Sequence, residues 1–206
     1  MTISEAEFTV NGRTALIKGP AAVPCRAGNA HGIYNPTDRP VQWMNVNVGF
    51  TKIYDAFDIN DPRVGVNLDP IPQFISARVD RSLARAVENM NGGKGSVLYR
   101  RAFEPSVFLT TWSYVDHLII PGGATVGPDG PSDVSETCYA MAGDGTVTLG
   151  GETVAFKAGD SLAVEAGQAK SFAGGSEPLQ ILVIGVARDM ASKEALMARP
   201  RPRSGK

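Results

Sequence analysis

Two charged residues in the C-terminal half of the chain have types and positions suited to acid/base chemistry. Glu136 opens a short apolar segment that ends at Gly143, and Lys170 follows a glycine-bounded stretch that begins at Gly159. A carboxyl group whose pKa is raised by burial can act as a general acid or base, and a nearby ammonium group can hold an anionic substrate or an enolate-like intermediate. The pair suits isomerisation, cyclisation or dehydration of a small molecule, because these reactions need proton transfer without redox chemistry.

Alternation along a strand extends this candidate site. Successive side chains of a strand point to opposite faces, so Cys138 shares the face of Glu136, and Phe172 shares the face of Lys170. We therefore predict Glu136 and Lys170 as catalytic residues and Cys138 and Phe172 as substrate-binding residues.

The only two histidines of the chain are weaker candidates. His31 lies in the segment 28–35 and is predicted to bind substrate, with a lone pocket histidine as the simpler interpretation. His117 follows Asp116 on a predicted strand, so the two side chains face opposite ways and His117 is expected in a core or an interface.

Short β-rich segments separated by turn residues must position these groups. Gly143-Asp-Gly145 and Gly150-Gly151 bound one segment, and Gly159-Asp160 and Gly167 bound the next. An apolar run at 179–186 follows. Such regular spacing favours an all-β fold, a small barrel or jelly roll.

These residues resemble the cupin family. Glu136 and Gly143 match the end of the family's first motif, and Gly159, Asp160 and Gly167 match its second. The resemblance implies a cupin jelly-roll barrel (double-stranded β-helix), here with a short helical linker and a C-terminal helix.

The chain departs from the family at its metal ligands. The two histidines of the first motif would fall within 129–132, where the sequence has Asp-Gly-Pro-Ser, and Lys170 stands in place of the third histidine. If the family's geometry holds, Glu136 and Lys170 converge where a metal would sit. One hypothesis is that their ion pair replaces the metal, so that neither metal nor cofactor is needed. The alternative is that Lys170 reaches solvent at the rim and Glu136 bonds only to backbone.

The N-terminal part resembles half of a second cupin unit. Gly28, His31 and Asn35 have the spacing of Gly167, Lys170 and Gly174, and a strand is expected at 40–48. This indicates a bicupin whose first unit lacks its own first motif. Either the chain is truncated, or its N-terminal strands complete the sheets of the second barrel or of a partner chain. The expected divisions are a partial unit at 1–50, a linker at 51–95, a complete barrel at 96–190, and a short helix with a basic tail at 191–206.

Two local predictions concern the N-terminal half. Asn11-Gly12 predicts a tight hairpin turn between the segments 7–10 and 13–18. The linker carries apolar residues at i, i+4 and i+8 intervals, which predicts one or two helices over 72–90; they are Phe74, Ile75, Val79, Leu83 and Val87.

Composition limits the partners. The net charge is −1, so no global charge attracts nucleic acid or an anionic membrane. Only two cysteines occur and no apolar run has the pattern of a membrane span or signal peptide, which favours a cytoplasmic setting with free thiols. We expect a small-molecule ligand and a homodimer that buries sheet edges. The alternative functions are a metal-dependent cupin dioxygenase or isomerase, and a non-catalytic structural or sensory cupin.

Overall fold

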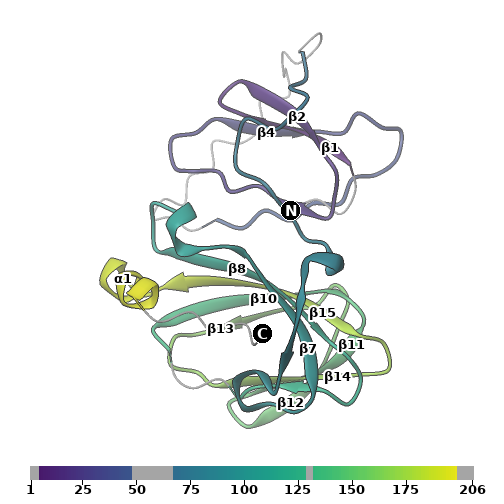
Figure 1. The fold of residues 1–206 in the computed structure, drawn as a ribbon, viewed down its shortest axis with the longest axis vertical. Helices are drawn as coiled ribbons and strands as arrows, with labels where there is room; N and C mark the ends of the chain where they lie inside the picture. The colour runs from purple at the N-terminus through teal and green to yellow at the C-terminus, as the bar shows by residue number, and fades with distance from the viewer. Residues whose placement is uncertain (1–4, 48–66, 129–131, 199–206) are drawn as a thin grey trace. The chain divides into compact units, whose positions relative to one another are not determined.

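The computed structural model of the chain describes residues 5–47, 67–128 and 132–198. The chain divides into two compact units, Met1–Val79 and Asp80–Lys206, which are described separately. The strands and the single α-helix carry the labels of Figure 1.

The first unit contains two small antiparallel sheets. One has the order β2-β1-β4 and the other pairs β3 with β5. Their bounds are β1 Ala6–Val10, β2 Arg13–Ile17, β3 Ala21–Ala22, β4 His31–Tyr34 and β5 Ala77–Arg78. The predicted hairpin is confirmed, since Asn11 and Gly12 have φ of 49° and 76° in the turn between β1 and β2. Ala15, Ile17 and Ala21 form a small core with Phe8 and Phe74.

The strand expected over 40–48 is not found in the described part of that segment. Residues 40–47 contain only a single bridge residue, Trp43. Alternating apolar residues there do not make a strand, because a strand also needs a neighbour along its length to pair its backbone groups.

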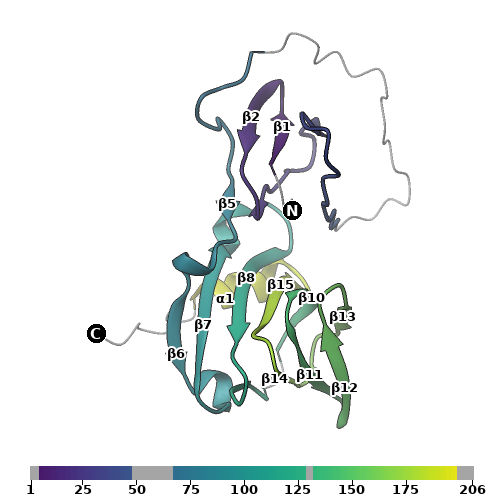
Figure 2. The ribbon, with the colours of Figure 1, turned by 90° about the vertical axis from the view of Figure 1, so that its right-hand side faces the viewer.

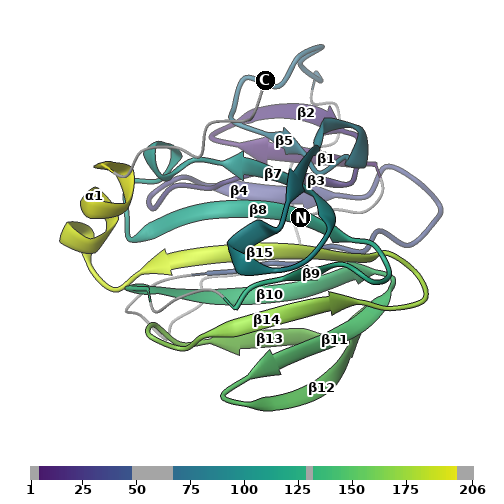
Figure 3. The same cartoon turned by 60° about the horizontal axis from the view of Figure 1, so that its bottom comes forward.

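The second unit is built from two sheets. A six-stranded sheet has the order β13-β10-β15-β8-β7-β6, and a four-stranded sheet has the order β12-β11-β14-β9. Figure 2 shows the central strands of the larger sheet side by side, and Figure 3 shows the smaller sheet across from it. The strands are β6 Arg85–Glu88, β7 Ser96–Phe103, β8 Trp112–Ile120, β9 Thr125–Val126, β10 Val134–Ala142, β11 Asp144–Leu149, β12 Glu152–Lys157, β13 Ser161–Val164, β14 Lys170–Gly174 and β15 Leu179–Ala187.

An apolar core fills the space between these two sheets. Leu118, Cys138 and Ile181 contribute from the large sheet, and Val147 and Phe172 contribute from the small one. The sequence period of two sends alternate residues of each strand into this core. The unit is therefore a two-sheet barrel, as the turn spacing predicted.

The predicted linker helix over 72–90 is wrong. This segment forms β5, the 3₁₀ turn η1 Arg81–Leu83 and strand β6, and a second 3₁₀ turn, η2 Met90–Gly92, follows. Arg85–Glu88 pairs with β7 through Arg85↔Tyr99 and Glu88↔Ser96, so pairing with the barrel sheet prevails over the helical spacing of apolar residues. The remaining part of the linker, 51–66, lies outside the described residues.

The C-terminal helix is present. Helix α1, Met190–Ala198, follows β15 directly and is the yellow element at the end of that strand in Figure 1. The buried Lys193 side chain donates through Nζ to the carbonyls of Phe108 (2.7 Å) and Thr110 (2.6 Å), which ties the helix to the loop that follows η3 Pro105–Val107. Residues 199–206 of the predicted tail lie outside the described residues.

Candidate active site in the barrel

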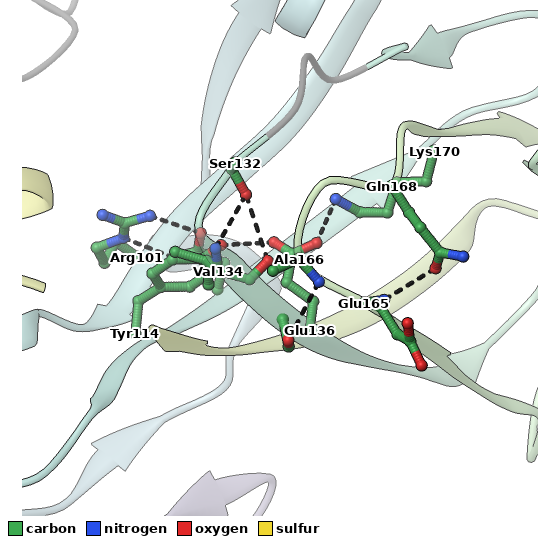
Figure 4. A network of polar contacts seen from close by, with 11 residues as sticks. Arg101, Tyr114, Ser132, Val134, Glu136, Glu165, Ala166, Gln168 and Lys170 are labelled. Carbon is green, nitrogen blue, oxygen red and sulfur yellow. Dashed lines mark hydrogen bonds and ion pairs between the residues drawn. The ribbon is translucent and has the colours of Figure 1, made fainter. Parts of the chain in front are cut away.

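Glu136 and Lys170 meet across the two sheets of the barrel. Glu136 is on β10 of the large sheet, and Lys170 is the first residue of β14 in the small sheet. Lys170 Nζ forms an ion pair with Glu136 Oε2 (Figure 4). The two side chains are 9% and 11% exposed, so the pair is largely desolvated while it still reaches solvent. The convergence expected for these two residues is present in the fold.

Tyr114 forms a hydrogen bond with the second oxygen of the Glu136 carboxylate. Its hydroxyl donates to Glu136 Oε1 at 2.5 Å, and the residue is 8% exposed. Burial raises the pKa of Tyr114, and the negative charge of Glu136 raises it further. The phenol therefore stays protonated and acts as a neutral donor.

A second charged pair lies beside the first. Arg101 donates from Nε to Asp116 Oδ1 at 2.8 Å and from Nη2 to Asp116 Oδ2 at 2.9 Å. Tyr99 adds a donor to Asp116 Oδ2 at 3.1 Å. The guanidinium carbon of Arg101 lies 4.4 Å from the ring centroid of Tyr114, which is cation–π distance. The two pairs and the two phenols thus form one connected network.

Burial and pairing act in opposite directions on the second pair. Burial raises the pKa of Asp116, and the hydrogen bonds and charge of Arg101 oppose that shift. Burial alone would lower the pKa of Arg101, but the hydrogen bonds and charge of Asp116 raise it. With Glu136 and Lys170, the network contains two cationic and two anionic side chains, so the polar interior of the barrel is balanced in charge.

Sheet register places these groups in line. Glu136 on β10 pairs with Gly185 on β15, and Gly185 pairs with Tyr114 on β8. On the next strand, Arg101 pairs with Asp116. The polar side chains therefore come from neighbouring strands of one sheet and point to its inner face.

A hydrogen-bonded loop positions Lys170 from the other side. The backbone N–H of Gly167 donates to the carbonyl of Ser132 at 2.8 Å, and the N–H of Ala166 donates to Ser135 Oγ at 3.2 Å. Within the loop, the N–H of Glu165 donates to Gln168 Oε1 at 2.9 Å (Figure 4). These bonds attach the segment before Lys170 to Ser132 and Ser135, which lie four residues and one residue before Glu136.

Comparisons with known proteins agree with this architecture. Residues 116–185 match the family described as cupin domain. A crystal structure from Thermotoga maritima, described as a predicted oxalate decarboxylase, is similar with a TM-score of 0.50 and 24% sequence identity, covering 52% of this chain and 96% of its own. The barrel has the cupin fold.

Another solved structure is similar over a larger part of the chain. A cupin 2 conserved barrel domain protein from Salinispora arenicola CNS-205 has a TM-score of 0.45 and 18% identity, covering 65% of this chain and 100% of its own. No curated protein matches the chain by sequence. Among the described residues, no helix has the length and apolar character required to cross a bilayer.

The donors present around Glu136 do not fit the metal of a cupin. Among the described residues, no group of three or more His, Cys, Asp and Glu side chains is arranged to hold a metal ion. Lys170, which the sequence comparison predicts at the position of the third histidine, places its ammonium group in an ion pair with Glu136. Residues 129–131, which include positions where the first motif would place a histidine, lie outside the described residues.

The other predicted site residues divide between the two units. Cys138 and Phe172 are in the barrel core at 0% and 3% exposure, and Phe172 packs against Phe156 with ring centroids 5.8 Å apart. His31 is an exposed residue of β4 in the first unit, where its Nδ1 lies 3.2 Å from the carbonyl of Asn29. Both cysteines are free thiols, as expected.

Sequence reasoning missed four of the six residues of the polar network as site residues: Tyr99, Arg101, Tyr114 and Asp116. A signal was available, because each strand carries two polar residues at i and i+2, Tyr-x-Arg on β7 and Tyr-x-Asp on β8. In a strand that spacing puts both side chains on one face. The predicted opposition of Asp116 and His117 is confirmed, since Asp116 joins the network and His117 points to the other face of the sheet.

Proposed function

We propose that the cupin barrel binds a small organic molecule and transforms it by metal-independent acid/base chemistry, as an isomerase, cyclase or lyase. Glu136 is the general acid or base, Lys170 stabilises negative charge on the substrate, and Cys138 and Phe172 line the apolar side of the site. The ion pair of Glu136 and Lys170 carries this proposal, because it joins a proton-transferring group and a cation inside a largely desolvated barrel.

The ion pair also suggests how a substrate would activate Glu136. In the resting site, Oε2 is paired with Lys170 and Oε1 accepts from Tyr114, so both carboxylate oxygens are engaged. A substrate oxygen that develops negative charge competes for the ammonium of Lys170 and releases Oε2. Glu136 Oε2 can then remove a proton from the substrate carbon next to the carbonyl group, and Lys170 stabilises the negative charge on the resulting enolate-like oxygen of the substrate.

Proton exchange tests this chemistry without knowledge of the natural substrate. The probes are pyruvate and dihydroxyacetone in D2O, which carry exchangeable protons beside a carbonyl and differ in charge. Deuterium incorporation, followed by NMR, is expected to be faster with the protein than in buffer, and Glu136→Gln should abolish the acceleration. Glu165→Gln, which neutralises an exposed carboxylate in the loop before Lys170, is the matched control and should retain it. No acceleration by the unaltered protein would contradict the proposal for enolisable carbonyl compounds.

A metal-dependent reaction is the competing function. Elemental analysis of protein purified without chelator, together with the exchange assay in EDTA, separates the two. Metal well below one per chain and exchange that persists in EDTA support the proposal. Stoichiometric metal with exchange lost in EDTA would replace it with a metal-dependent cupin dioxygenase or isomerase.

The proposal extends to the origin and assembly of the chain. The common spacing at 28–35 and 167–174 supports descent from a bicupin with a degenerate metal motif. The edge strands β2 and β4 of the first unit support a homodimer, since sheet edges favour pairing. Mass measurement in solution tests the dimer, and a monomer at working concentration would contradict it.

A further inference from the structure

Tyr114 is the residue that links the two charged pairs of the barrel. Its hydroxyl donates to Glu136 Oε1 at 2.5 Å, and its ring lies 4.4 Å from the guanidinium carbon of Arg101. It is buried and carries no charge itself, so it contacts both pairs without disturbing their balance.

The backbone of β15 leaves space for this ring. A Cβ atom at Gly185 would lie 2.3 Å from Tyr114 Cζ and 2.6 Å from both Cε atoms, closer than real Cβ contacts. Arg101 is itself held by Asp116 through two hydrogen bonds. The Gly185 backbone and the Arg101 guanidinium together fix the ring and therefore the position of its hydroxyl.

Each oxygen of the Glu136 carboxylate has a different donor. Oε1 receives the hydroxyl proton of Tyr114, and Oε2 pairs with Lys170, the group that a substrate anion would engage. Once Lys170 turns to the substrate, the hydrogen bond from Tyr114 still holds the carboxylate in place. We propose that Tyr114 is a positioning residue that holds Glu136 by Oε1 and thereby presents Oε2 for proton transfer. This inference rests on the proposed function, in which Glu136 is the proton-transferring group.

NMR spectroscopy tests the contact itself. A short O–H···O⁻ hydrogen bond places its proton far downfield of the amide region, so the unaltered protein is expected to show such a resonance. Tyr114→Phe should remove it and Glu136→Gln should shift it upfield. Tyr139→Phe makes the same chemical change on the opposite face of β10 and should leave it in place. Absence of the resonance from the unaltered protein, or its persistence in Tyr114→Phe, would overturn the inference.

Exchange kinetics test the consequence for catalysis. Phenylalanine keeps the ring in contact with Arg101 and Gly185, so the variant removes only the hydroxyl. Loss of orientation is expected to lower the turnover number about a hundredfold while KM changes little. An unchanged turnover number would overturn the positioning role. If the unaltered protein shows no exchange at all, the proposed function fails, whereas the resonance still decides whether Tyr114 holds Glu136.

Discussion

Glu136 and Lys170 form an ion pair in the barrel, and neither side chain is more than 11% exposed. Removing one partner leaves a charge that is both buried and unpaired, which is among the costliest changes a core can undergo. We expect Lys170→Met to lower the free energy of unfolding by about 3 kcal/mol or more. The double variant Glu136→Gln with Lys170→Met should recover part of that loss, because the unpaired charge is then absent.

Denaturant titration of the two single variants and the double variant measures this coupling. Arg188 and Asp133 provide a matched control, since they form an ion pair at 2.9 Å with side chains 63% and 56% exposed. Arg188→Met is expected to cost at most about 1 kcal/mol. Equal costs for Lys170→Met and Arg188→Met would show that the barrel pair is not desolvated in solution.

The buried His117 predicts that the free energy of unfolding depends on pH. It is 1% exposed, and neither ring nitrogen has a hydrogen-bond partner among the described residues. Burial lowers the pKa of His117 below its ordinary value of 6.5. The unfolded chain thus takes up a proton at a pH where the folded chain does not. The contribution to stability is therefore complete above about pH 6.5 and declines as the pH falls from 6.5 toward the lowered pKa, by at most about 1.4 kcal/mol per pH unit.

Chemical unfolding between pH 7.5 and 5 measures this effect. His117→Leu should flatten the decline, because leucine cannot take up a proton. His31→Gln changes the other histidine, which is exposed in the first unit, and should leave the decline unchanged. If the decline disappears in His31→Gln and remains in His117→Leu, the pH dependence comes from His31 and not from His117.

At the level of elements, the packing of strand β15 against the Tyr114 ring depends on a single glycine. Gly185 lies between Glu136 on β10 and Tyr114 on β8, and a methyl group there would overlap the Tyr114 ring. Gly185→Ala is expected to lower the free energy of unfolding by about 1–3 kcal/mol, as overpacking does, and to displace the Tyr114 hydroxyl from Glu136. Thermal or denaturant unfolding and the hydroxyl resonance measure the two effects.

Gly32→Ala is the control for Gly185→Ala. Gly32 lies in strand β4, and a Cβ atom there would have nothing within 4 Å. The control should change the free energy of unfolding by no more than about 0.5 kcal/mol. A similar small effect at Gly185 would mean that the ring can move away without cost and that β15 does not fix it.

Elements bounded by turn residues could be predicted from the sequence. Asn11-Gly12 and Gly150-Gly151 have positive φ, which few other residues adopt. The strands predicted on either side of Asn11-Gly12 and before Gly150 are present as β1, β2 and β11. The prediction of a helix in the linker failed because apolar spacing at i and i+4 indicates a helix only when no sheet edge competes for the segment. The edge of β7 does compete, and residues 85–88 pair with it.

At the level of the whole molecule, the site could be predicted only as far as motif spacing reaches. Glu136 and Lys170 were found because the cupin motifs fix their places in the sequence. Tyr114 contacts Glu136 from 22 residues away, through a register that runs from β8 across β15 to β10. No local pattern specifies that order of strands, because it is decided by how the complete barrel closes. The division of the chain at Val79 also depends on contacts between distant residues.

The stability of the whole molecule should not depend on divalent metal. An ion that binds only the folded state raises its stability by RT ln(1 + [L]/Kd), so a tightly bound metal shifts the unfolding temperature by several degrees. Among the described residues, no group of three or more His, Cys, Asp and Glu side chains could hold a metal ion, and Glu136 forms an ion pair with Lys170. We therefore expect the unfolding temperature to change by less than about 1 °C when Zn²⁺, Mn²⁺ or EDTA is added. Calorimetry measures this shift, and Lys170→His, which adds a ligand and removes the ammonium, is the informative variant. A stabilising shift in the variant alone would show that Lys170 excludes metal from the barrel, whereas a shift in the unaltered protein would contradict replacement of the metal by the ion pair.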